Sequence, residues 1–257
     1  MTTFITISIE YMTYMQFNEL NQNFKKSIML WLVALTAMVF LIIIIGGLTR
    51  LTDSGLSMVD WQPILGTIPP LNNNQWQSVF NDYKLSPEFI YVNKNMSLDE
   101  FKYIFWWEWF HRFFARLIGV VFIIPFIYFL VKKNMNSFFY KRFSIIFSLG
   151  LFQALVGWWM VKSGLSENPY VSPYRLTFHL SNAIIIYALL LWTSIEYYHL
   201  KNTNFISIKS KNVFILISIF LVFITILSGG FMAGSHAGQS FNTYPLMNGK
   251  FIPDDIY

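Results

Sequence analysis

The sequence predicts an all-α fold, a polytopic membrane helical bundle, and three observations carry this prediction. Of the 257 residues, 55% are hydrophobic and only 12% are charged, and the mean hydropathy is +0.47. Five apolar stretches are long enough to cross a bilayer. The lysines and arginines gather in alternate connections between these stretches, which is the pattern of membrane proteins with a fixed orientation. Soluble folds are therefore set aside.

The first span is predicted at residues 27–48, an uncharged apolar stretch of about twenty residues, which is enough to cross the bilayer core. Residues 1–26 form a polar leader without arginine. Such a leader fits neither a secretory signal nor a transit peptide and is interpreted as a cytoplasmic tail. Further spans are predicted at residues 104–131, 143–161, 176–192 and 213–232.

The charges of the connecting segments orient the bundle. The leader, the second link and the fourth link carry most of the cations close to the spans: Lys25, Lys26, Lys132, Lys133, Lys141, Arg142, Lys201, Lys209 and Lys211. The first and third links carry most of the acids instead. The positive-inside rule therefore places the amino terminus inside and the long link of residues 52–103 outside. We expect that link, which is rich in Pro, Asn and Trp, to fold as a cap over the outer helix ends.

An internal repeat relates the end of the first span to the end of the fifth, at an offset of 229 minus 46, or 183 residues. The matched positions are Gly46, Gly47, Gly55, Gly66, Pro70 and Trp61 with Gly229, Gly230, Gly238, Gly249, Pro253 and Tyr244. Two homologous halves are implied, a four-helix half at residues 27–204 and the first helix of a second half at 205–257. A second half of equal size predicts three more spans after Tyr257.

The stretch FWWEWFHRFFAR, residues 105–116, places ionisable side chains at the mouth of a hydrophobic helix. On a helix, Glu108 lies one turn before His111 and Arg112, and Arg116 lies one turn further on. Ionisable residues in or beside a membrane span favour a functional site. The alternative is an interfacial belt, in which tryptophans sit at headgroup depth and Glu108 simply pairs with Arg112.

Two histidines are predicted to lie at similar depth, because His111 and His179 both begin spans that run from outside to inside. Two neutral imidazoles facing each other across a bundle are the usual axial ligands of a six-coordinate haem iron. The alternative is that each is a satisfied core residue. Guanidinium groups near the same rim suit haem propionates, with surface anchoring as their alternative role: Arg112, Arg116 and Arg175. With no cysteine, a thiolate metal site is excluded, and the scattered net charge of +5 predicts no nucleic-acid partner.

These residues resemble a known family, the haem A synthases of mitochondria and proteobacteria. Five stretches carry the resemblance: GGLTRLTDSGLSMVDWQPILGTIPPL from Gly46, FKYIFWWEWFHRFFARLIG from Phe101, FQALVGWWMVKSGL from Phe152, VSPYRLTFHL from Val171 and GGFMAGSHAGQSFNTYPLMNGKFIPD from Gly229. They cover nearly all of the chain after the leader. The paired cysteines that some bacterial members carry in the first outer loop are absent.

The resemblance implies eight helices in two halves and oxidation of the C8 methyl of haem O to the formyl of haem A, for cytochrome oxidase biogenesis. It implies that Glu108 and His111 fill the family's E-x-x-H site and that His179 is the second ligand. The family's second histidine pair and its haem b belong to helices six and eight, which are expected after Tyr257. The implied setting is the bacterial or mitochondrial inner membrane, with haem O synthase, a redox partner and a homo-oligomer as the partners to consider.

Glu108 is the predicted catalytic residue. Oxidising a methyl to a formyl group removes hydrogens and adds oxygen, so a base or a carboxylate that stabilises positive charge is needed at the porphyrin edge. The alternative is that Glu108 only holds Arg112 for a propionate. At the level of the whole chain, the alternative function is a non-catalytic b-type haem-binding protein that transfers electrons, and a transporter ranks third.

Overall fold

The structure is a computed structural model that describes residues 22–60, 65–133, 135, 137–166, 168–202, 213–240, 243 and 246–251. Five long helices dominate the described part: α2 (Gln22–Leu51), α5 (Leu98–Val131), α6 (Ser137–Lys162), α7 (Pro173–Asn202) and α8 (Val213–Ser235). Each is long and apolar enough to cross a membrane. The predicted all-α polytopic bundle is confirmed. Residues 1–21 of the predicted leader, and Trp61, Tyr244 and Pro253 of the predicted repeat, lie outside the described residues.

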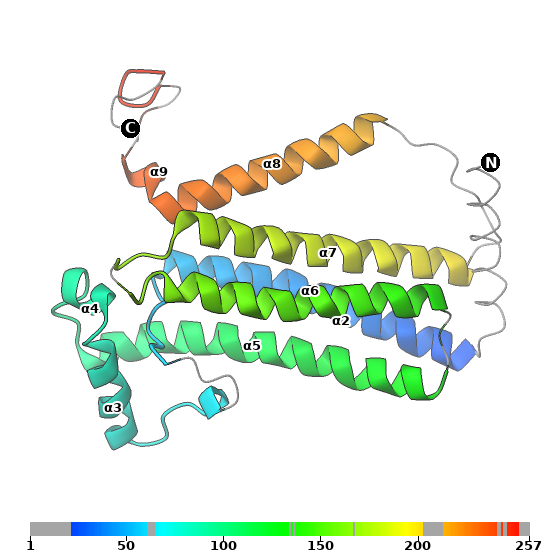
Figure 1. The fold of residues 1–257 in the computed structure, drawn as a ribbon, viewed down its shortest axis with the longest axis horizontal. Helices are drawn as coiled ribbons and strands as arrows, with labels where there is room; N and C mark the ends of the chain where they lie inside the picture. The colour runs from blue at the N-terminus through cyan, green and yellow to red at the C-terminus, as the bar shows by residue number, and fades with distance from the viewer. Residues whose placement is uncertain are drawn as a thin grey trace.

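Four of the long helices form an antiparallel bundle. Helix α2 packs on α5 and α7, and α6 packs on α7 and, more lightly, on α5. Helix α8 packs on α7 near the end where α9 (Ala237–Ser240) follows, and it diverges from the bundle towards its start (Figure 1). The arrangement brings the end of α2, the start of α5, the end of α6 and the start of α7 to one end of the molecule.

The helices begin earlier or end later than the apolar stretches alone predict. Helix α2 starts at Gln22 instead of residue 27, so part of the predicted leader is helical. Helix α5 starts at Leu98 because Ser97 and Glu100 form a capping box, in which the Glu100 carboxylate accepts the Ser97 amide at 2.7 Å. Polar residues thus extend helices whose apolar centres are easier to recognise.

The described part of the link after α2, residues 52–60 and 65–97, lies at one end of the bundle, and we call it the cap. It contains η1 (Leu65–Thr67), α3 (Asn73–Tyr83) and α4 (Pro87–Tyr91) and lies at the α9 end of the bundle (Figure 1). Asn72 caps α3 and Ser86 caps α4 through their side chains. Trp76 and Phe80 of the cap pack against Phe105 and Phe101 of α5, both with ring centroids 5.0 Å apart. This aromatic cluster anchors the cap on the start of α5.

Trp31 organises the core of the bundle at the opposite end. Its ring lies 5.5, 5.7 and 5.0 Å from those of Phe122, Phe129 and Phe143, so it joins α2 to α5 and α6. Its indole N–H donates to the carbonyl of Val121 at 2.8 Å. The buried tryptophan therefore has its polar atom satisfied, as burial in an apolar core requires.

The ends of α2 and α8 share an uncommon backbone conformation. Asp53 and His236 both have a left-handed φ, of 47° and 53°. These two residues are separated by 236 minus 53, or 183 residues, which is the offset of the predicted repeat. Left-handed φ is uncommon for residues other than glycine, so its occurrence at the matched position supports the internal repeat.

Candidate functional site

His111 lies on α5, and its ring packs against Gly46 of α2. A Cβ added at Gly46 would be 3.1 Å from His111 Cε1 and 3.6 Å from Nδ1. His111 Nδ1 is buried and has no hydrogen-bond partner. A glycine at position 46 therefore makes room for the imidazole ring, and one ring nitrogen is left with its bonding capacity unused.

His179 lies on α7 in an equivalent setting against α6. A Cβ added at Gly157 would be 3.0 Å from His179 Cε1, and His179 Nδ1 is buried without a partner. The starts of α5 and α7, which carry the two histidines, lie at the same end of the bundle (Figure 1). The structure thus places both predicted ligands towards the cap end, each seated on a glycine of a neighbouring helix.

Gln153 of α6 holds the His179 ring from the other side. Its amide nitrogen lies 3.3 Å from His179 Nε2 and donates to the His179 carbonyl at 3.1 Å. Asn182 in turn donates to the Gln153 side-chain oxygen at 2.8 Å. These contacts fix the orientation of the His179 ring. The sequence alone does not predict this role for Gln153, although the residue belongs to the stretch FQALVGWWMVKSGL that carries the family resemblance.

Glu108 is only 3% exposed and its carboxylate faces the cap. It accepts hydrogen bonds from the Ser57 hydroxyl at 2.7 Å and from the Met58 amide at 2.8 Å, and it forms an ion pair with Arg112. Arg112 also donates to the Met58 carbonyl at 3.3 Å. The carboxylate therefore binds Ser57 and Met58 of the cap to α5. The pairing of Glu108 with Arg112 that the sequence offered as an alternative is present, and the catalytic role remains a prediction.

The three predicted propionate-binding arginines lie at the same end of the bundle but in different surroundings. Arg112 is engaged by Glu108, and Arg116 follows it one turn later on α5. Arg175, at the start of α7, donates to the Trp159 carbonyl at 2.8 Å and lies over the Trp159 ring at 4.5 Å. Within residues 108–116 of α5, two arginines and one acid leave one excess positive charge, which suits an acidic ligand.

A second buried carboxyl lies in the cap. Glu88 is 6% exposed and accepts a hydrogen bond from the Tyr83 hydroxyl at 2.9 Å. Burial raises the pKa of Glu88 to about 8, with smaller contributions from the charges of Glu108 and Asp53. Burial and the neighbouring Glu88 likewise raise the pKa of Tyr83 above its usual value. No periodic pattern marks Glu88 as buried, because α4 has only five residues.

The described residues contain no group of three or more His, Cys, Asp or Glu side chains that could hold a bare metal ion. Two histidines alone suit an iron whose remaining ligands come from a porphyrin. The two unpartnered Nδ1 atoms and the two glycine seats fit such a group, since a buried polar atom without a partner costs about 1–3 kcal/mol.

Comparison with known proteins places the chain in a family. Residues 29–257 match the family model described as cytochrome oxidase assembly protein. The chain belongs to this family. Integral membrane location follows from the family together with the five apolar helices. All the residues predicted for the site lie within the matched region.

Several curated relatives of the cytochrome oxidase assembly protein family are named Heme A synthase. The chain is 49% identical to that of Nitrosospira multiformis over 238 residues, which are 91% of this chain and 66% of the relative. It is 47% identical to that of Nitrosomonas eutropha (90% and 65% covered) and 42% identical to that of Flavobacterium psychrophilum (90% and 69% covered). The chain thus spans about two thirds of the length of these relatives. No solved structure matches it. The family resemblance read from the sequence is confirmed.

Proposed function

We propose that this member of the family is a haem A synthase, an oxidoreductase that converts the C8 methyl of haem O to the formyl group of haem A. The observation that carries the proposal is the pair of buried imidazoles, His111 and His179, each seated against a glycine and each with an unpartnered Nδ1. Relatives named Heme A synthase support the choice of reaction. The supply of haem A for cytochrome oxidase assembly follows from this activity.

His111 and His179 would hold the iron of the porphyrin in the described half. Haem O is the substrate, and a haem b, the resident cofactor that the family resemblance implies, supplies electron transfer when bound. Neither ring needs to lose a proton to coordinate iron, because neutral imidazole is the ligand form. Gln153 fixes the orientation of His179 through its amide, and Gly46 and Gly157 set how closely the rings approach their neighbouring helices.

Glu108 would act at the edge of the substrate. The Ser57 hydroxyl, the Met58 amide and Arg112 hold its carboxylate in one place at the cap end of α5. A fixed carboxylate near a carbon that is oxidised stabilises the positive charge that develops there and can accept the proton that leaves, while the electrons pass to the redox partner. Arg112, Arg116 and Arg175 would pair with the propionates of the porphyrin.

The orientation and the domain division are part of the same proposal. The amino terminus lies inside, residues 27–204 form one four-helix half, and residues 205–257 begin a second. Haem O synthase and a redox partner are the proteins with which such an enzyme would exchange substrate and electrons. A homo-oligomer is compatible with the exposed apolar faces of a membrane bundle.

Substitution Glu108→Gln tests the catalytic role, with Glu196→Gln as the matched control. Glu196 forms an ion pair with Arg142 at the opposite end of the bundle, so the control removes a similar charge pair away from the site. Each variant is produced in membranes that make haem O, and extracted haems are separated by chromatography. We expect Glu108→Gln to retain haem O without forming haem A, and Glu196→Gln to form haem A. Equal haem A in both variants would overturn the catalytic role, and loss of all haem from Glu108→Gln would assign it a structural role instead.

The ligand pair has its own test. His111→Ala and His179→Ala should each remove the low-spin haem spectrum or reduce the haem content. If the double variant keeps both the spectrum and the product of the parent protein, the two histidines are core residues. If haem b binds normally but haem A is never formed, the chain is an electron-transfer protein.

A further inference from the structure

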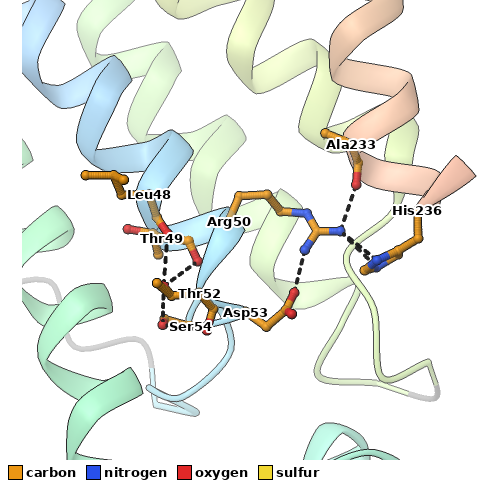
Figure 2. Close-up of polar contacts among 8 residues, drawn as sticks. All are labelled: Leu48, Thr49, Arg50, Thr52, Asp53, Ser54, Ala233 and His236. Atoms are coloured by element: carbon orange, nitrogen blue, oxygen red, sulfur yellow. Dashed lines mark hydrogen bonds and ion pairs between the residues drawn. The ribbon is translucent and has the colours of Figure 1, made fainter. Parts of the chain in front are cut away.

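Arg50, the penultimate residue of α2, connects the two ends of the predicted repeat. One terminal nitrogen of its guanidinium donates to Asp53 at 2.6 Å. The other donates to the carbonyl of Ala233 at 2.7 Å and lies 2.8 Å from Nε2 of His236 (Figure 2). One side chain on α2 thereby contacts a carboxylate, a main-chain oxygen and an imidazole, and two of these belong to the end of α8.

The contact joins matched positions of the two halves. With the offset of 183 residues, Arg50 corresponds to Ala233, and Asp53 corresponds to His236. Asp53 and His236 are the two left-handed residues that end α2 and α8. Left-handed backbone outside glycine costs about 1–2 kcal/mol per residue, so it persists where surrounding contacts hold it. The guanidinium contacts both of these residues.

Each of the two joined helices also touches a helix that carries a predicted iron ligand. On α2, Gly46 lies one turn before Arg50 and seats His111. On α8, a Cβ at Gly234 would be 2.7 Å from the backbone of Pro173, and one at Gly230 would be 3.1 Å from the Thr177 hydroxyl. Helix α8 therefore packs directly on the first turns of α7, just before His179.

These contacts close a triangle at the cap end. Helix α2 packs on α7, α7 packs on α8, and Arg50 joins α8 back to α2. Because α8 diverges from the bundle at its other end (Figure 1), its cap end is where it can fix the start of α7. Arg50 thus adds a direct link between α8 and α2 at the end where Gly46 seats His111 and α8 packs on the first turns of α7.

We propose that Arg50 is a positioning residue for the histidine pair, which it holds in register by locking the end of α8 onto α2. The proposal rests on the proposed function, because the spacing of His111 and His179 matters only if both bind one haem iron. Arginine suits the role because its planar fork reaches several acceptors at once, whereas lysine offers one point charge. Since arginine only donates, His236 must present an unprotonated nitrogen to it.

The first test measures the spacing without haem. The chain contains no cysteine, so single cysteines introduced at Leu48 of α2 and Tyr174 of α7, both exposed, give unique sites for spin labels. Pulsed electron paramagnetic resonance should give one narrow distance distribution in the labelled parent. We expect Arg50→Ala to broaden or shift it, and His236→Ala to do so less. Arg142→Ala, which breaks the ion pair at the other end, should leave it unchanged.

The second test measures haem binding in the same series, with haem O, the substrate proposed for this histidine pair, added to the purified chain. We expect Arg50→Ala to shift the low-spin signal and to weaken haem O binding about tenfold, the scale of one lost charged hydrogen bond. Arg50→Lys should be intermediate, and His236→Gln, which keeps an acceptor, should stay close to the parent. If Arg50→Ala folds poorly, the same question is answered by comparing haem binding in His236→Ala, which removes the acceptor, with haem binding in His236→Gln, which keeps one.

The outcomes separate the two proposals. An unchanged distance distribution and an unchanged haem signal in Arg50→Ala would overturn the positioning role while leaving the ligand pair intact. Equal effects of Arg50→Ala and Arg142→Ala would show that Arg50 contributes only to general stability, and they would also overturn the positioning role. If His179→Ala leaves the low-spin signal unchanged, the ligand pair itself is wrong, and both proposals fall together.

Discussion

The glycine seats allow a sharp prediction about the two histidines. Substitution Gly157→Ala adds one methyl group that would lie 3.0 Å from Cε1 of His179, and Gly46→Ala adds one 3.1 Å from Cε1 of His111. Two other glycines are matched controls. Gly150, on the same helix as Gly157, and Gly47, next to Gly46, would place a Cβ with nothing within 4 Å.

The expected magnitudes follow from these distances. In a helix interior, Gly→Ala is favourable by up to about 1 kcal/mol, so Gly150→Ala and Gly47→Ala should be neutral or stabilising. At Gly157 and Gly46 the added methyl overlaps the imidazole by a few tenths of an ångström, and the His179 ring cannot turn away without losing Gln153. Overpacking of this kind costs about 1–3 kcal/mol. Each test variant should therefore unfold more easily than its control.

The assay is thermal unfolding in detergent, followed by the visible spectrum with haem O added. We expect both test variants to lower the unfolding temperature relative to their controls and to shift or weaken the low-spin haem bands. The control variants should keep the parent spectrum. If Gly157→Ala matches Gly150→Ala in both measurements, the His179 ring does not rest on α6 and the proposed iron site loses its geometric basis.

Three further predictions concern the cap and the orientation. Since burial raises the pKa of Glu88 from 4.5 to about 8, the folded cap binds a proton that the unfolded chain releases, and cap stability should fall by up to about 1.4 kcal/mol per pH unit through that window. The protection of α3 and α4 against hydrogen exchange should show this pH dependence, and Glu88→Gln should abolish it. If the pH dependence persists in Glu88→Gln, another group causes it. Ser57→Ala should cost about 1.5–3 kcal/mol by removing a buried hydrogen bond to a carboxylate, and stability within error of the parent would contradict that bond. An alkaline phosphatase fused within residues 72–74 should be active outside the membrane, whereas an active fusion at Lys133 would invert the orientation.

Much of the fold could be predicted because it depends on local signals. Length and hydropathy identify a membrane helix, so each of the five spans coincides with a helix of the structure. The ends differ because capping is decided by single polar residues. Ser97 with Glu100 starts α5 six residues before the predicted span at residue 104, and no apolar pattern marks that position. The cap was predicted from the length of the link, but its short helices were not.

The site was predictable in its residue types and less so in its contacts. His111 and His179 could be paired because topology gives them the same depth. Their glycine seats and Gln153 could not be recognised, because each contact joins different helices and leaves no periodic signal in the chain. The contact between Arg50 and His236 spans 186 residues, and no local pattern in the sequence connects the two.

Glu108 shows how one side chain can be assigned two roles that the structure makes compatible. Its carboxylate accepts hydrogen bonds from Ser57 and Met58, in the first segment of the cap after α2, and it pairs with Arg112 on its own helix. A group that holds the first turn of the cap is also fixed relative to the seat of His111 on α2. Structural restraint of this kind is what a catalytic carboxylate needs, because stabilisation of a transition state depends on charges that do not move during reaction. The pairing with Arg112 is therefore a condition for the catalytic role, and Arg112→Lys, which keeps the charge but not the fork, should reduce haem A formation while leaving haem O bound.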